Sequence, residues 1–163
     1  MDRKRIESEL TAEQQVVRMR SEYPGFAVVV STPWIVIWHG ELVPYAQPYS
    51  VQILYCSISL ALANIQGRTP HVEVIEPFLG RRSSRPEQPI PHVWVNPVIP
   101  SRPRLCLNTA WEWTTAMYIA DTIVPWTIEW LAAYEGWRAT GTWYAGGHNS
   151  EREHLRNPRR HGR

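Results

Sequence analysis

The sequence lacks the features that mark a membrane or an extracellular protein. Its 163 residues include only two cysteines, Cys56 and Cys106. No apolar run reaches the roughly 20 residues that a membrane-spanning helix needs, and no signal peptide is recognisable. We therefore expect a cytoplasmic protein with no membrane association. The reducing conditions of the cytoplasm would disfavour a disulfide between the two cysteines.

An excess of charge of either sign is also missing. Seventeen basic residues oppose fifteen acidic ones, which gives a formal net charge of only +2, and Lys4 is the single lysine. A balance this close does not indicate a basic face built for nucleic acid, so we do not expect nucleic acid as a partner.

Several catalytic motifs are absent as well. There is no glycine-rich phosphate loop, no Gly-x-Ser-x-Gly elbow and no His-Glu-x-x-His helix. His71-Val72-Glu73 matches half of a zinc-deaminase motif, but the Cys-x-x-Cys half is missing. No cofactor or metal is therefore expected.

What is present predicts one α+β domain over residues 1–150, followed by an arginine-rich, flexible tail over residues 151–163. Residues 3–21 are rich in helix formers, with Ile6, Leu10, Val16 and Val17 on one side. Alternating or β-branched segments follow, and they predict a four-stranded antiparallel meander. These strands are expected at residues 26–31, 34–42, 49–56 and 70–75.

The second half of the chain predicts a long loop and then a helix. Residues 80–104 contain six prolines and five arginines, which argues against regular structure, and a loop this long in a small domain is usually functional or disordered. Thr114 or Thr115 can cap the following helix, Pro125 either kinks it or begins a second segment, and Gly141 ends it. The tryptophan-rich stripe of this helix is expected to pack on the sheet.

Cys106 is the main candidate for chemistry. It lies between Leu105 and Leu107, so in an extended segment the leucines would face the core and the sulfur would point away. The opposing interpretation is a small buried hydrophobic residue, which is the common state of a thiol that forms no disulfide. Cys56, at the end of an alternating strand, fits that second interpretation better.

Four other polar residues are candidates for assisting roles. His92 can exchange protons near neutral pH or simply fix the loop by a hydrogen bond. Asn96 and Asn108 can each donate an amide hydrogen to an oxyanion, although asparagine in such a loop also makes turns. His148 follows two glycines and fits a solvated turn residue.

The order of these elements resembles that of the ubiquitin-conjugating enzymes, over roughly Glu7 to Tyr134. The segment Leu105-Cys106-Leu107-Asn108 resembles the Ile-Cys-Leu-Asp around the family's catalytic cysteine. Other segments resemble its third strand, its proline-led fourth strand, its His-Pro-Asn region and the Trp-Ser-Pro that opens its next helix. These segments are Tyr49-Ser50-Val51-Gln52-Ile53, Pro70-His71-Val72, Pro91-His92-Val93 and Trp113-Thr114-Thr115. His92 lies fourteen positions before Cys106, farther than is usual in the family, and no asparagine adjoins it.

The tryptophan-rich ending resembles bacterial relatives that accompany cGAS-like nucleotidyltransferases in antiphage (CBASS) signalling. The resemblance implies an acyltransferase in which Cys106 takes up a protein C-terminus as a thioester. The donor would be the nucleotidyltransferase or a ubiquitin-like protein, and a separate activating enzyme is a further possible partner. Two alternatives stay open: an inert binding module of the same fold, and an arginine-rich interaction domain for an acidic partner such as RNA.

Overall fold

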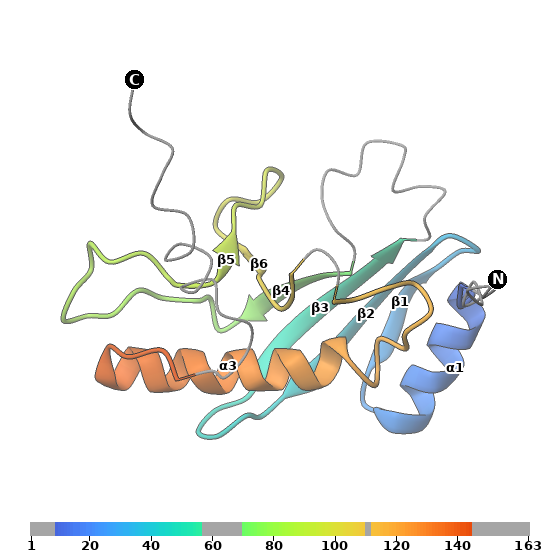
Figure 1. The fold of residues 1–163 in the computed structure, drawn as a ribbon, viewed down its shortest axis with the longest axis horizontal. Helices are drawn as coiled ribbons and strands as arrows, with labels where there is room; N and C mark the ends of the chain where they lie inside the picture. Colours follow the sequence, from blue (N-terminus) through green and yellow to red (C-terminus); the bar gives the residue numbers. More distant parts are fainter. Residues whose placement is uncertain (1–8, 57–69, 110–111, 145–163) are drawn as a thin grey trace, which may run out of the picture.

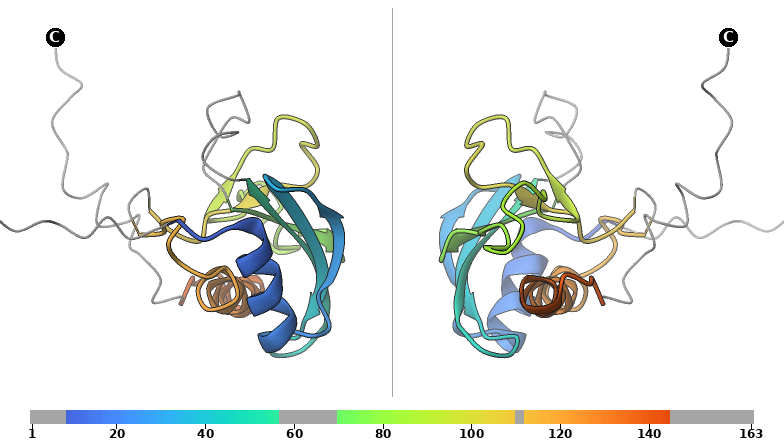
Figure 2. Two further views of the ribbon diagram at one scale, coloured as in Figure 1. Left: turned by 90° about the vertical axis from the view of Figure 1, so that its right-hand side faces the viewer. Right: turned by 90° about the vertical axis from the view of Figure 1, so that its left-hand side faces the viewer.

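The computed structural model describes residues 9–56, 70–109 and 112–144. Over these residues the chain forms an α+β structure in which two α-helices pack on one face of an antiparallel sheet (Figures 1 and 2). The sheet has six strands in the order β1-β2-β3-β4-β6-β5. The strands are β1 (Ala27–Ser31), β2 (Ile35–Leu42), β3 (Tyr49–Cys56), β4 (His71–Glu76), β5 (Val93–Trp94) and β6 (Arg104–Leu105).

The sheet therefore has two more strands than the four we expected. β5 lies inside the segment 80–104, for which the sequence predicted no regular structure, and β6 begins at the last residue of that segment. They form a short antiparallel hairpin in which Val93 pairs with Leu105, and β6 joins the sheet through the pair Glu73–Arg104. Each strand has only two residues, so no alternating pattern marks them in the sequence.

The core lies between the sheet and the helices, and strand alternation explains it. In β2, Val36 and Trp38 are fully buried and face the core, whereas Ile35 and Ile37 are half-buried on the opposite face. Trp38 pairs across the sheet with Ile53 of β3, which is also fully buried. This face of the sheet and the helices that cover it together form the hydrophobic core.

The first helix, α1 (Ala12–Glu22), begins later than the sequence predicted. Thr11 accepts a hydrogen bond from the Gln14 backbone, and the Gln14 side chain accepts one from the Thr11 backbone, which forms a capping box. Such a cap marks the beginning of the helix, so residues 9–11 are not helical. Residues 3–8 of the predicted helix, including Ile6, lie outside the described residues.

The apolar side predicted for α1 is only partly correct, since Val16 packs half-buried against the core but Val17 does not. Val17 is 62% exposed, whereas Ala12, Gln15 and Met19 are buried. Gln15 is tolerated there because its side chain donates to the Met117 carbonyl at 2.9 Å and accepts from the Ile119 backbone at 2.9 Å.

The second helix, α3 (Ile123–Thr140), lies across the sheet face beside α1 (Figure 2). The segment of Thr114 and Thr115 forms turns and does not cap it, so the predicted start was wrong. Pro125 is in the first turn, where its missing N–H costs nothing and no kink is needed. Gly141 ends the helix in the left-handed conformation, as expected. Over the residues that the structure describes, neither helix has the length and hydrophobicity to span a bilayer.

Candidate functional site

Cys106 lies immediately after β6, at the base of the β5–β6 hairpin. Leu105 before it is buried in the core, and Leu107 after it is half-buried against the same core. Cys106 is itself half-buried, and its backbone N–H donates to the His92 carbonyl at 2.9 Å. The two leucines thus anchor the segment on both sides of Cys106, and their packing against the core is as predicted from the sequence.

Cys56 occupies a different environment. It is only 1% exposed at the end of β3, and burial raises the pKa of its thiol. Both cysteines lie in the described part of the chain, where they are thiols and do not form a disulfide. Because the thiolate is the nucleophile, the environment of Cys56 suppresses its reactivity.

His92 is opposite Cys106 across the hairpin. Its carbonyl accepts hydrogen bonds from the Cys106 backbone and from Trp130 Nε1, both at 2.9 Å. The residue has φ of +52°, in the left-handed region that side chains other than glycine seldom occupy. Its ring lies against Trp143, with 4.9 Å between the ring centroids. The main chain of His92 therefore ties the cysteine segment to α3.

Asn96 holds the loop of the hairpin. It is only 1% exposed, and its Nδ2 donates to Glu73 Oε1 and to the Arg102 carbonyl, both at 2.9 Å. Its Oδ1 accepts from the backbone N–H groups of Val98 and Ile99. Both amide hydrogens are thus used in holding the loop, one to β4 and one to the Arg102 backbone, which matches the turn-making alternative left open by the sequence.

Glu73, which sequence reasoning missed as a site residue, supports this anchor from β4. Its side chain is 13% exposed, and its Oε1 lies 3.8 Å from Arg104 Nε. Burial raises the pKa of the Glu73 carboxyl, while Arg104, Arg102 and the Asn96 hydrogen bond act in the opposite direction. In the sequence, Glu73 is a carboxylate in an alternating strand, and an arginine-containing loop follows that strand. Many surface glutamates have such a context, so this pattern did not identify Glu73 as a site residue.

Asn108 lies near the surface, two residues after Cys106. Its Nδ2 donates to the Thr109 carbonyl at 2.8 Å, and the Thr109 backbone donates to Glu112 Oε2 at 2.6 Å. Asn108 therefore sits in a turn beside the thiol segment. His148 and the tail lie outside the described residues.

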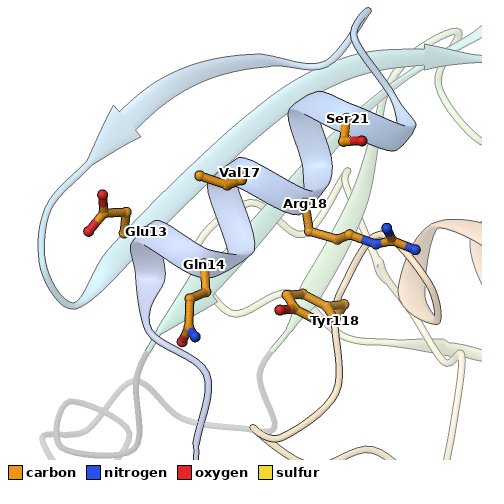
Figure 3. A pocket seen from close by; sticks show the side chains of 6 residues that line it. All are labelled: Glu13, Gln14, Val17, Arg18, Ser21 and Tyr118. Carbon is orange, nitrogen blue, oxygen red and sulfur yellow. The ribbon is translucent and has the colours of Figure 1, made fainter.

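A shallow depression that does not involve the hairpin is lined by residues of α1 and by Tyr118 (Figure 3). Arg18 lies within it and forms an ion pair with Asp121 at 2.9 Å, and its guanidinium lies 5.8 Å from the Tyr118 ring centroid. The charges of Arg18 and Asp121 are thus paired with each other, and no cysteine lines the depression. Over residues 9–56, 70–109 and 112–144, no cluster of three His, Cys, Asp or Glu side chains is arranged to hold a metal ion.

Comparison with known proteins places most of the chain in one family. The model of the family described as type II CBASS E2 protein matches residues 15–151, which include both strands of the hairpin and Cys106. No curated protein matches the chain. Membership of that family indicates a role in CBASS antiphage defence, and its E2 designation suggests a conjugating transferase with partners in the same defence system. The chain therefore belongs to the type II CBASS E2 protein family.

Proposed function

We propose that the chain is an acyltransferase with a ubiquitin-conjugating-like fold that carries a protein C-terminus as a thioester on Cys106. The observation that carries the proposal is the half-buried thiol held between two core-anchored leucines, in a member of an E2 family. The helix–sheet–helix order and the hairpin before the cysteine support the fold assignment. Cys56 has no such role because it is buried and its pKa is raised.

The chemistry is covalent acyl transfer in two steps. The Cys106 thiolate attacks the carbonyl carbon of an activated C-terminus, so a C–S bond forms and the activating group leaves with its bonding electrons. An acceptor amine then attacks the thioester carbon and loses a proton, while the C–S bond breaks and the thiolate returns.

The neighbouring residues have distinct roles in this proposal. Asn108 is the candidate donor to the oxyanion, because its turn adjoins the cysteine and its amide lies near the surface. Asn96 positions the hairpin that carries Cys106, since its amide hydrogens are engaged in the loop. His92 fixes the cysteine backbone through its carbonyl, and its imidazole is the candidate for proton exchange.

The donor in this proposal is the cGAS-like nucleotidyltransferase of the same CBASS system, with a ubiquitin-like protein as the alternative. The family membership supports the choice, because it associates the chain with partners of that defence system. Conjugation to the nucleotidyltransferase would regulate its activity during phage infection. The donor's C-terminus must be activated before Cys106 attacks it, and a separate activating enzyme is a possible source of that activation.

The test uses the donor with its C-terminus activated, mixed with three forms of the chain. Wild type and Cys56→Ala should form an adduct that hydroxylamine and thiols cleave, and Cys106→Ala should form none. Equal adduct in Cys106→Ala and wild type would contradict the proposal. Failure of Cys106 to react with a small thiol reagent in the folded protein would favour the inert binding module instead.

A further inference from the structure

The tip of the β5–β6 hairpin, residues 94–101, exposes an unusual amount of apolar surface. Asn96 is its one buried residue, and Ser101 is its one polar residue among those exposed. Val95 is 83% exposed and Val98 is 78% exposed. The remaining exposed residues of the tip are Trp94, Pro97, Ile99 and Pro100. Soluble proteins seldom leave such surface contiguous unless it contacts a partner.

This tip is held in place and does not fold back onto the core. Asn96 makes three hydrogen bonds to the backbone of Val98, Ile99 and Arg102 and a fourth to Glu73 of β4, and the Arg102 backbone donates to the Ile99 carbonyl at 2.9 Å. Figure 1 shows the loop rising from β5 and β6 beyond the end of the sheet. A loop fixed in one conformation loses little entropy when it binds, so its exposed side chains are preorganised for contact.

The charged residues of the hairpin indicate which kind of partner surface would complement the tip. Residues 93–105 contain Arg102 and Arg104 and no acidic residue. The Arg102 guanidinium lies 5.6 Å from the ring centroid of Phe78, a ring that is itself exposed and extends the apolar surface. A complementary surface is therefore apolar and bears a carboxylate that can pair with Arg102. A second copy of this chain fits poorly, because residues 93–105 offer no carboxylate of their own to Arg102, and Glu73 beside them already lies against Arg104.

The tip and the thiol are parts of one hairpin. Ile99 is seven residues before Cys106, and an extended chain of that length spans at most about 25 Å. A protein bound at the tip can therefore place an extended C-terminal tail of about eight residues on Cys106. Docking at the tip would raise the effective concentration of that tail at the thiol.

We propose that the hairpin tip is the docking surface for the folded body of the donor protein whose C-terminus Cys106 carries. The donor contacts it through an apolar patch that bears at least one carboxylate, with Trp94 and the two exposed valines as central contacts. This inference rests on the proposed acyl transfer, because it names the surface that recognises the donor for that reaction.

The test measures calorimetric binding of the cGAS-like nucleotidyltransferase of the same CBASS system, in a Cys106→Ala background that cannot react. Val95→Ser with Val98→Ser should raise the Kd by about tenfold or more. The matched control is Val17→Ser with Val43→Ser, which alters two exposed valines on α1 and after β2 and should change the Kd by less than about twofold. Equal affinity in tip and control variants would overturn the inference.

Two further readouts separate the docking surface from the chemistry. In the Cys106-containing protein, the tip variant should react with iodoacetamide at the wild-type rate and lose adduct formation only at low donor concentration. Weakened binding without any Cys106 adduct in wild type would contradict the acyl transfer and leave the docking surface standing. A dimer that the tip substitutions dissociate, seen by light scattering, would overturn the assignment of the donor as occupant.

Discussion

The two cysteines lie at strand ends in different parts of the same sheet, and their surroundings differ. Cys56 ends β3, a central strand whose neighbours on both sides are long, and it is 1% exposed. Cys106 follows β6, a two-residue strand that pairs with β4 and β5 near the sheet margin, and it is half-buried. Position at a strand end is therefore not what makes a thiol available.

The difference comes from what surrounds each sulfur. Leu105 and Leu107 take the core-facing positions around Cys106, so the core is filled without the thiol. At Cys56 the thiol itself is enclosed, and burial raises its pKa. The backbone of the Cys106 segment is thus anchored while the residue itself stays half-buried, whereas Cys56 is buried outright.

The largest expected effect is on thiol chemistry. Because Cys56 is enclosed and its pKa is raised, it should react only after local opening of the sheet. We expect iodoacetamide to modify Cys106 at least about a hundredfold faster than Cys56, which corresponds to about 2.7 kcal/mol of opening free energy. Peptide mass spectrometry over a time course measures both rates, and similar rates would break the comparison.

Removal of the loop anchor should affect one cysteine and spare the other. Asn96→Ala leaves the Glu73 carboxylate and three backbone groups without their partner, so we expect a loss of about 2–3 kcal/mol in the free energy of unfolding. Urea unfolding measures this loss.

In the same Asn96→Ala variant the rate of adduct formation on Cys106 should fall, while Cys56 stays protected from alkylation. The matched control is Ser101→Ala, which alters an exposed residue of the same loop and should leave both properties near wild type. Unchanged adduct formation in Asn96→Ala would show that the anchor does not position the thiol.

Replacing each cysteine with serine compares the two environments through the free energy of unfolding. Cys56→Ser places a hydroxyl in an enclosed site and should cost about 1–2 kcal/mol of unfolding free energy. Cys106→Ser, at a half-buried position, should cost less than about 0.5 kcal/mol. Thermal and urea unfolding of the two variants measure the difference, and equal costs would mean that the two sulfurs share one environment.

The smallest expected effect is the pH dependence contributed by Glu73. Burial raises the pKa of this carboxyl, so the folded chain holds the proton to higher pH than the unfolded chain. The contribution of Glu73 to stability is fully present below its unfolded pKa of about 4.3, and it is lost as the pH rises through the folded value.

Glu73→Gln does not titrate there, so wild type should gain stability relative to this variant as the pH falls from about 7 to about 5. The change in the difference between the two unfolding free energies measures the effect. A difference that moves the other way would mean that the arginines outweigh the burial of the carboxyl.

Much of this architecture follows from the sequence, and the reasons are local. The strand predicted at residues 49–56 matches β3, because its buried and half-buried residues alternate without interruption through Tyr55. Gly141 ends α3 because glycine adopts the left-handed conformation without strain. Leu105 and Leu107 were correctly expected to pack against the core.

The errors arise where tertiary contacts override local pattern. Gln15 is buried and Val17 is exposed on α1 because Gln15 finds two backbone partners in the segment before α3, which no periodicity can reveal. The role of Glu73 depends on a pairing of β4 with β6 that the sequence did not predict. The assisting residues around Cys106 are therefore less predictable than the cysteine itself.

The most direct measurement is to map the donor attachment site. Trypsin should separate the two cysteines, since cleavage after arginine puts Cys56 in the peptide 21–68 and Cys106 in the peptide 105–138. After reaction with the activated donor, we expect tandem mass spectrometry to find the donor's C-terminal residues on the second peptide alone, and hydroxylamine to release them. Attachment to the first peptide, or a modification that hydroxylamine does not release, would contradict thioester formation on Cys106.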